Sequence, residues 1–290
     1  MILPIMLIAL FCANQQEPQR IFAPGKPTGT LSHTAIHEAS GLVASAVNPR
    51  WFWTHNDSGD KARIFLIDDS ARHRATFYLE GVKARDWEDI AMMEQGGRNY
   101  LLVGDIGDNR KQYPYVTVHL FEEPLVDGEA TTIDTIPKGG IKHFIFTYED
   151  GPRDAESLIF DPVDSAIYII SKRELEAGIY RAKLPERYTG DTLTLKCVGK
   201  LPHTFITGAD ISPDGSEILV KNLLDVYYWK RRPGETVATA LQRPAVRLPY
   251  VPEPQGEAIA FARDGSGYYT LSESPLGLTS RLYFYKRLTE

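Results

Sequence analysis

A five-residue pattern recurs five times along the chain, at intervals that few folds can accommodate. The copies are EASGL, DWEDI, DAESL, GADIS and QGEAI, and their central residues are Ser40, Glu88, Glu156, Asp210 and Glu257. Successive centres are 48, 68, 54 and 47 residues apart, which is about the length of one four-stranded blade of a β-propeller. Each copy is therefore expected to begin the first strand of one blade.

The segments between the copies are short apolar runs of strand length, such as 51–54, 116–121 and 166–170. Gly, Pro, Asn and Asp separate these runs, and hardly any segment has the apolar spacing of a long helix. We therefore expect an all-β fold, a five-bladed β-propeller over residues 21–290. The last copy leaves room for only three strands, so residues 28–36 are expected to supply the fourth and close the ring. The alternatives are six blades, with a partial blade in the 68-residue interval, and a two-sheet sandwich.

Charge and hydropathy exclude some classes of protein. The net charge is −6, so no overall basic field attracts nucleic acid. Beyond the first dozen residues, no apolar run approaches the roughly 20 residues that span a bilayer. We expect a monomer that acts on a small anionic substrate or binds a surface partner, without a transmembrane span.

Residues 1–17 have the apolar, uncharged character of a secretion leader that lacks a basic start. They predict export to the periplasm, the cell envelope or the medium. Cys12 is a candidate for a lipid anchor, although the bulky Phe11 precedes it where a small residue is usual. The only other cysteine is Cys197, so no internal disulfide is expected once the leader is removed.

In a propeller, one position of each first strand faces the central channel, so the five pattern centres are expected to converge there. The residues two positions earlier are expected on the same side if the extended period holds. These residues are Glu38, Asp86, Asp154, Gly208 and Gln255. Converging carboxylates repel one another unless a cation compensates them. Hard oxygen ligands favour Ca²⁺, with Mg²⁺ as the alternative, and the predicted metal ligands are Ser40, Glu88, Glu156, Asp210 and Glu257. The competing interpretation is that these acids cap turns.

The second strand of each blade returns to the same mouth and ends in a polar cluster. The candidate catalytic residues are His55, Asp57, Asp105 and Lys172. The candidate substrate-binding residues are Asn56, Asp108, Asn109, Arg173, Lys221 and Glu273. An aspartate would accept a proton from water, and the lysines would neutralise developing charge; the alternative is a solvated rim of ion pairs. No nucleophile elbow and no Cys/His nucleophile pair is evident.

The motifs HNDSG, DWEDIA, LLVGDIGDN, DAESL, ADISPDG and QGEAIAF, over residues 36–275, resemble those of exported bacterial β-propeller proteins of poorly defined function. The chain is also distantly similar to phytase-like propellers and to the five-bladed calcium-activated nucleotidases (apyrases). That resemblance implies an ion held by the five pattern centres and a substrate facing Asp57, Asp105 and Lys172. HNDSG and GDIGDN lack the Arg, Lys and Trp of the apyrase segments, so these two segments do not support nucleotide specificity.

Two functions remain open from the sequence. The first is a calcium-dependent hydrolase of a small phosphoester or phosphoanhydride, with a lactone as the less favoured substrate. The second is a non-catalytic exported propeller with a structural ion and a binding surface. An enzyme requires open coordination and nearby basic groups, whereas a structural ion is fully ligated.

Overall fold

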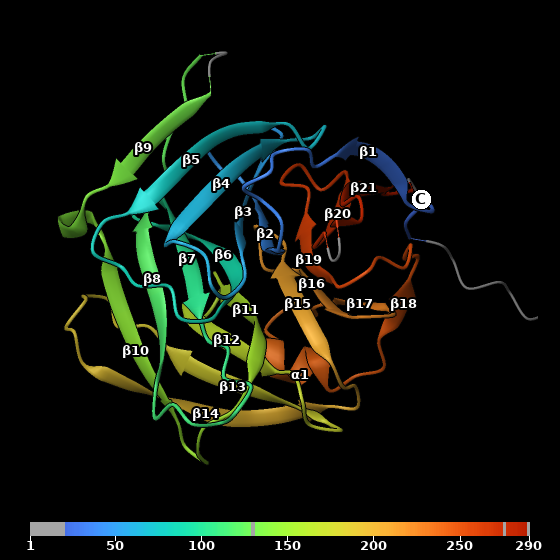
Figure 1. Cartoon of the computed structure of the whole chain (residues 1–290). Coiled ribbons are helices and arrows are strands. Elements are labelled where there is room, and N and C mark those ends of the chain that lie inside the picture. Colours follow the sequence, from blue (N-terminus) through green and yellow to red (C-terminus); the bar gives the residue numbers. More distant parts are fainter. Residues whose placement is uncertain (1–20, 129–130, 275–276, 289–290) are drawn as a thin grey trace, which may run out of the picture.

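The computed structural model describes residues 21–128, 131–274 and 277–288, and these residues form an all-β structure (Figure 1). Its helical elements are one turn of 3₁₀-helix, η1 (Lys138–Gly140), and the short helix α1 (Val237–Leu241). Within the described ranges, neither helix is long and apolar enough to cross a membrane. The predicted leader at residues 1–17, including Cys12, lies outside the described residues.

Apart from β9, the strands of the described residues group into five units of four. The first three units are β2 (Ala39–Ala44), β3 (Trp51–Asn56), β4 (Arg63–Asp68) and β5 (His73–Leu79); β6 (Trp87–Gln95), β7 (Arg98–Asp105), β8 (Val116–Glu122) and β10 (Lys142–Tyr148); and β11 (Ala155–Asp161), β12 (Ala166–Ser171), β13 (Ala177–Lys183) and β14 (Thr192–Leu201). The last two are β15 (Ile206–Ile211), β16 (Glu217–Asn222), β17 (Val226–Lys230) and β18 (Val246–Leu248); and β19 (Gly256–Phe261), β20 (Gly267–Ser272), β21 (Arg281–Lys286) and β1 (Lys26–Thr30).

The five innermost strands form a closed ring. Strands β2, β6, β11, β15 and β19 each contact the next, and β19 contacts β2 (Figure 1). The N-terminal strand closes the last unit by pairing antiparallel with β21, Lys26 opposite Phe284 and Thr30 opposite Arg281. The closing segment is thus Lys26–Thr30 rather than the expected 28–36. The β-propeller architecture predicted from the repeat is therefore present.

The long second interval has a structural explanation. Between β8 and β10 the chain leaves its own unit and forms β9 (Thr132–Ile136), which pairs in parallel with β5 of the first unit. A second parallel pairing, between β10 and β14, joins the second and third units into one eight-stranded sheet. In the part of the chain that the structure describes, the additional length therefore extends existing units and does not form another inner strand.

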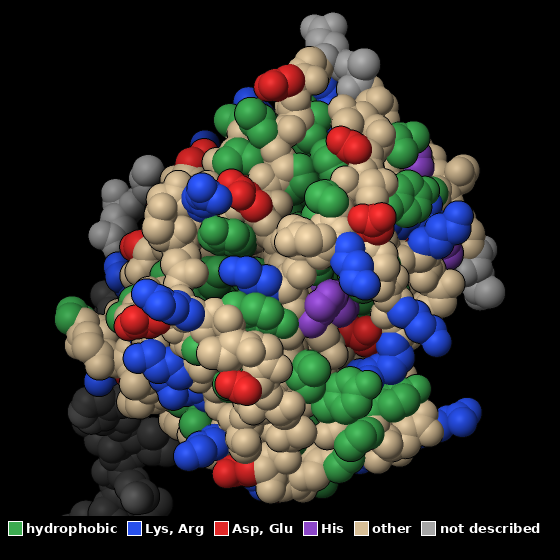
Figure 2. Space-filling model, turned by 90° about the vertical axis from the view of Figure 1, so that its left-hand side faces the viewer, with side chains coloured by type: hydrophobic (Ala, Val, Ile, Leu, Met, Phe, Trp, Pro, Cys, Tyr) green, Lys and Arg blue, Asp and Glu red, His purple; other side chains and the backbone are tan. Residues whose placement is uncertain are grey.

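Large apolar side chains fill the space between adjacent units. Trp53 and Trp87 are buried in the cluster between the first and second units, and Trp229 is buried in that between the third and fourth. Burial of side chains of this size is the main stabilising contribution to such a ring. Trp51, by contrast, is half-buried. On the outer surface near β9 and β10, acidic and basic side chains are interspersed (Figure 2).

Candidate functional site

Each inner strand begins with an irregularity in its pairing with the second strand of its unit. In β6, Trp87 pairs with Asp105 and Asp89 with Gly104, so Glu88 is the extra residue of a β-bulge. The extra residues of β11, β15 and β19 are, in order, Glu156, Thr207 and Glu257. A bulge interrupts the alternation of side chains and re-aims the inserted residue. The pattern centres in β6, β11 and β19 thereby reach the mouth, as expected.

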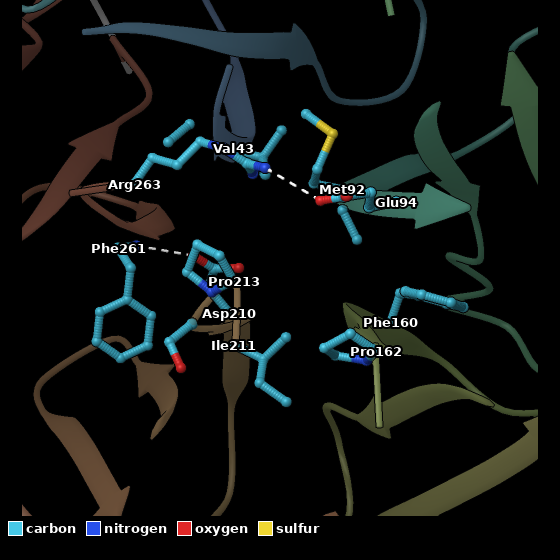
Figure 3. Close-up of a pocket in the computed structure, with 13 residues that line it drawn as sticks. Val43, Met92, Glu94, Phe160, Pro162, Asp210, Ile211, Pro213, Phe261 and Arg263 are labelled. Carbon is cyan, nitrogen blue, oxygen red and sulfur yellow. Dashed lines mark hydrogen bonds and ion pairs between the residues drawn. The ribbon is translucent and has the colours of Figure 1, made fainter. Parts of the chain in front are cut away.

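The prediction that Asp210 is the convergent residue of the fourth inner strand is wrong, because that position belongs to a residue three places earlier. Thr207 occupies the position of Glu257, and the preceding residues, Phe205 and Gln255, both have positive φ, 53° and 44°. Asp210 lies near the opposite end of its strand, where its Oδ2 accepts a hydrogen bond of 2.7 Å from the Phe261 amide (Figure 3). Asp210 is therefore not among the carboxylates gathered at the mouth, and Gln255 and Gly208 supply no carboxylate there.

Among the described residues, seven carboxylates converge at the mouth. They form three overlapping triads, in each of which one oxygen per residue lies within 4.8 Å of the others: Asp57, Glu257 and Glu273; Asp57, Asp86 and Glu88; Glu88, Asp154 and Glu156. Asp57 and Glu88 each belong to two triads, so the three form one continuous cluster. These acids come from the starts of inner strands and from the ends of second strands, as the two-strand argument predicted.

Basic side chains compensate only part of this charge. Lys172 forms an ion pair with Glu156 and lies 3.6 Å from Glu257, while Arg173 Nε lies 2.5 Å from Asp154 Oδ2. The triad of Asp57, Asp86 and Glu88 has no such ion pair among the described residues. This triad is therefore where a cation would compensate the most uncompensated charge.

Three observations fit a divalent cation in this cluster. Its donors are carboxylate oxygens, the ligands that Ca²⁺ and Mg²⁺ prefer. Glu156 is buried, and no described group forms a hydrogen bond with its Oε2. Gly107 lies so close to Glu88 and Asp86 that a β-carbon there would collide with both carboxylates. The residues present can hold such an ion, whose identity the donor set does not fix between calcium and magnesium.

The protonation of the cluster reflects its burial. Desolvation, followed by repulsion from neighbouring acids, raises the pKa of Asp57 to about 7, that of Asp86 to about 6 and that of Glu273 to about 8. Burial and the adjacent carboxylates also hold the pKa values of Glu88 and Glu156 well above the usual range. Burial alone would lower the pKa of Lys172, but Glu156 and Glu257 raise it.

Several predicted site residues form hydrogen bonds that hold the backbone around the mouth and do not belong to the carboxylate cluster. Asp105 accepts hydrogen bonds from the amides of Arg85 and Asp86, at 3.2 and 3.1 Å, and so positions a cluster acid. Asn56 Oδ1 accepts from the amides of His37 and Glu38. In these contacts polar side chains at strand ends satisfy backbone groups, a role that was predicted as the alternative for the acids of the repeated pattern and not for these residues.

The GDIGDN loop is held in the same manner. Asp108 accepts from the amides of Gln112 and Tyr113, at 3.0 and 2.8 Å, and closes a turn. The amide of Asp108 donates to Asp154, and Asn109 accepts a hydrogen bond from Arg173. The loop therefore fixes Asp154 and Arg173 relative to the cluster.

His55, Lys221 and Ser40 lie deeper than their sequence positions suggested. His55 is fully buried, with its ring 5.7 Å from that of Trp87, and desolvation lowers its pKa to about 4. Lys221 is also fully buried; its Nζ donates to the Asn222 carbonyl at 3.0 Å, and burial lowers its pKa to about 8. Ser40 donates to the Glu88 carbonyl at 2.6 Å, which connects β2 to β6.

Asp86 and Asp154 belong to the carboxylate cluster. They were expected on the side of the channel mouth but were not predicted as metal ligands. Asp89 was missed: it is buried, and its Oδ2 accepts from the Leu158 amide at 2.8 Å, linking β6 to β11. Glu38, predicted beside the cluster, is half-exposed and pairs with His37 at 3.5 Å. The sequence does contain a signal for Asp86 and Asp154. Each directly precedes an inner strand and lies two residues before a predicted ligand, Glu88 or Glu156.

The cluster predicts an unusual pH dependence of stability without added cation. Because the carboxylate pKa values are raised in the folded state, the native protein binds more protons than the unfolded chain, and stability falls as pH rises through them. Between pH 6.5 and 8, where Asp57 and Glu273 titrate, we expect the free energy of unfolding to fall by about 1 to 2 kcal/mol. Urea unfolding of chelator-treated protein measures this. Calcium should suppress the fall, and a stability that rises across the interval would contradict it.

Comparison with known proteins identifies the architecture and no family. No protein-family model matches the sequence, and no curated protein sequence matches it. A solved structure of a nidogen/laminin complex aligns at a TM-score of 0.50 with 12% identity, covering 83% of this chain and 74% of that one. At this identity the likeness concerns the fold alone.

Two solved enzymes align over more of the chain. The PQQ-bound aldose sugar dehydrogenase of Streptomyces coelicolor has a TM-score of 0.48 and 12% identity, covering 91% of this chain and 99% of that one. A luciferin-regenerating enzyme has a TM-score of 0.46 and 10% identity, covering 90% and 95%. The matched structures are six-bladed propellers, the alternative weighed from the sequence, whereas the described strands of this chain group into five units.

Proposed function

We propose that this chain is a five-bladed β-propeller that binds a divalent cation, Ca²⁺ in the first instance, at the mouth of its channel and hydrolyses a small anionic substrate there. The observation that supports the proposal is the carboxylate cluster, in which the triad of Asp57, Asp86 and Glu88 has no ion pair with a basic group among the described residues. A phosphoester or phosphoanhydride is the preferred substrate class, and a lactone is the less favoured one.

Asp86 and Glu88 would hold the ion, with Asp57 at its edge. A bound cation supplies charge neutralisation and polarises a substrate oxygen. Asp57 is partly open to solvent, and its pKa of about 7 in the cation-free protein suits a group that accepts a proton from water near neutral pH. Its carboxylate therefore orients and deprotonates the attacking water.

Basic groups on the rim would attract the substrate. The side chains of Arg173 and Lys111 are 41% and 48% exposed, so both can reach an anion at the mouth. Arg173 also remains paired with Asp154, which fixes its position. Lys172 is engaged with Glu156 and Glu257, so it would tune the charge of the cluster and leave substrate contact to the rim.

The hydrolysis assay has two arms and a matched control. Purified protein is incubated with p-nitrophenyl phosphate, bis(p-nitrophenyl) phosphate, ATP and gluconolactone, with excess calcium or with chelator. We expect calcium-dependent turnover of a phosphate substrate, and at least a tenfold lower kcat for Asp57→Asn. Asp210→Asn, at the other end of the channel, should retain turnover. Cation binding without turnover of any of these substrates would favour the non-catalytic propeller.

The non-catalytic alternative also has structural support, because Lys172 and Arg173 already neutralise part of the cluster without any ligand. In that function the ion would stabilise the ring, and the rim would bind a partner. We further propose that the chain is exported and acts as a monomer, with lipid attachment at Cys12 as the alternative to a cleaved leader.

A further inference from the structure

A cavity of about 580 Å³ lies at the junction of the first and fifth units, where the ring closes. It is lined by the connection between β2 and β3, by the start of β3, and by β20, β21 and the turn that precedes β20. Pockets of a few hundred to about 1,000 Å³ are the usual size of small-molecule sites. The carboxylate cluster contributes no residue to this cavity, which is a separate feature of the molecule.

Aromatic rings form its wall. Tyr269 stacks on Phe284 with 4.6 Å between ring centroids and an interplanar angle of 30°, and Phe52 lies 4.5 Å from Tyr269. Trp51 is the fourth aromatic residue of the lining. Tyr269, Phe284 and Trp51 are only partly buried, so each retains surface toward the cavity. Such a wall favours a flat apolar ligand, because aromatic rings pack best against offset or edge-on partners.

The charges of the lining oppose the overall charge of the protein. Three basic side chains line the cavity, from Arg50, Arg263 and Lys286, against one acid, Asp264. Arg50 pairs with Asp69, and Arg263 pairs with Glu94 at 3.7 Å. The Glu94 side chain is 63% exposed, so this pair is weak and leaves Arg263 able to contact a ligand. Lys286 forms no ion pair among the described residues, so an anion in the cavity can meet both Lys286 and the weakly paired Arg263.

Arg263 also lies where the cavity meets the channel end opposite the carboxylate cluster. Arg263 and Ala44 line both spaces. Figure 3 shows Arg263 extending toward Glu94 across this opening, with Asp210 and Phe261 below it. An anionic group held by Arg263 would therefore point toward the channel, while the flat part of the ligand lies against the aromatic wall.

We propose that this cavity is a binding site for a small planar aromatic anion. The ring system packs against Tyr269 and Phe284, and the anionic group pairs with Arg263, with Lys286 adding to the positive field. The proposal does not depend on the hydrolase function or on a bound cation, since none of these residues belongs to the carboxylate cluster.

Calorimetric titration with two probes tests the proposal. Naphthalene-2-sulfonate carries the ring and the negative charge, whereas 2-naphthol carries the same ring and is neutral at pH 7. We expect the sulfonate to bind at least tenfold more tightly than the naphthol. Arg263→Gln should remove most of that preference while leaving calcium affinity unchanged.

Two further variants separate a specific site from surface adsorption. Ser266 is exposed on the lining and hydrogen-bonds to Asp264. Ser266→Trp loses the hydroxyl's part of that contact, but it should fill the cavity and weaken the binding of both probes at least tenfold. Arg187 is exposed and lies outside the cavity, so Arg187→Gln should leave the affinity for both probes unchanged. Equal affinity for the two probes, no binding of either, or unchanged binding in Ser266→Trp would overturn the proposal. If Ser266→Trp does not fold, Arg263→Gln decides alone.

Discussion

Glu88→Gln is expected to weaken calcium binding by about a hundredfold, or about 2.8 kcal/mol of binding free energy, while making the cation-free protein more stable. Glu88 belongs to two of the three carboxylate triads and is buried. The amide that replaces it keeps its size but loses the charge that a cation requires. In the absence of a cation, the same change removes the cost of burying the Glu88 carboxyl, and of protonating it, beside Glu156 and Asp57.

The two effects are measured on one pair of proteins. Calorimetry on chelator-treated samples gives the calcium affinity, and thermal unfolding with and without calcium gives the stability. The wild type should gain stability on adding calcium, whereas Glu88→Gln should start higher and gain little. Asp210→Asn is the matched control, because Asp210 was predicted as a ligand but lies at the far end of its strand. Equal loss of affinity in both variants would place the ion elsewhere along the channel.

The fold class and most of the cluster could be predicted because the repeat encodes them. A strand start that carries an acid before an alternating apolar run recurs at blade length, and the first strands of a propeller must converge. The prediction for Asp210 is wrong because the turn after the inner strand, and not the acid, marks the register of the repeat. Ile211-Ser212-Pro213-Asp214-Gly215 corresponds to the turn that begins at Phe261, and that correspondence would have placed Thr207 beside Glu257.

The depth of individual side chains could not be predicted. His55 and Lys221 stand at strand ends beside Asp57 and Asn222, yet both are fully buried, because the neighbouring units cover that face of the strand. The residue type and the two-residue period of a strand predict on which face of the sheet a side chain lies. They do not predict which other unit covers that face. The cavity at Arg263 and Tyr269 likewise depends on the first and last units meeting, a contact between segments more than 200 residues apart.

Lys172→Met is expected to destabilise the cation-free protein and to strengthen its binding of calcium. Lys172 is largely buried and pairs with Glu156, with Glu257 at 3.6 Å. Without it, two buried carboxylates lose their nearest positive charge, which should cost about 2 kcal/mol of stability at neutral pH. The same loss removes a charge that repels an incoming cation, so calcium affinity should rise roughly tenfold.

The comparison with Lys111→Met isolates this electrostatic role. Lys111 is another lysine near the mouth, but its side chain is 48% exposed and it lies 3.5 Å from Glu174; an exposed pair contributes little to stability. We expect Lys111→Met to unfold at the wild-type temperature and to bind calcium with wild-type affinity. Calcium should therefore raise the unfolding temperature of Lys172→Met more than that of either other protein. Unchanged affinity in Lys172→Met would mean that the ion lies beyond the field of Lys172, and therefore outside the carboxylate cluster at the mouth.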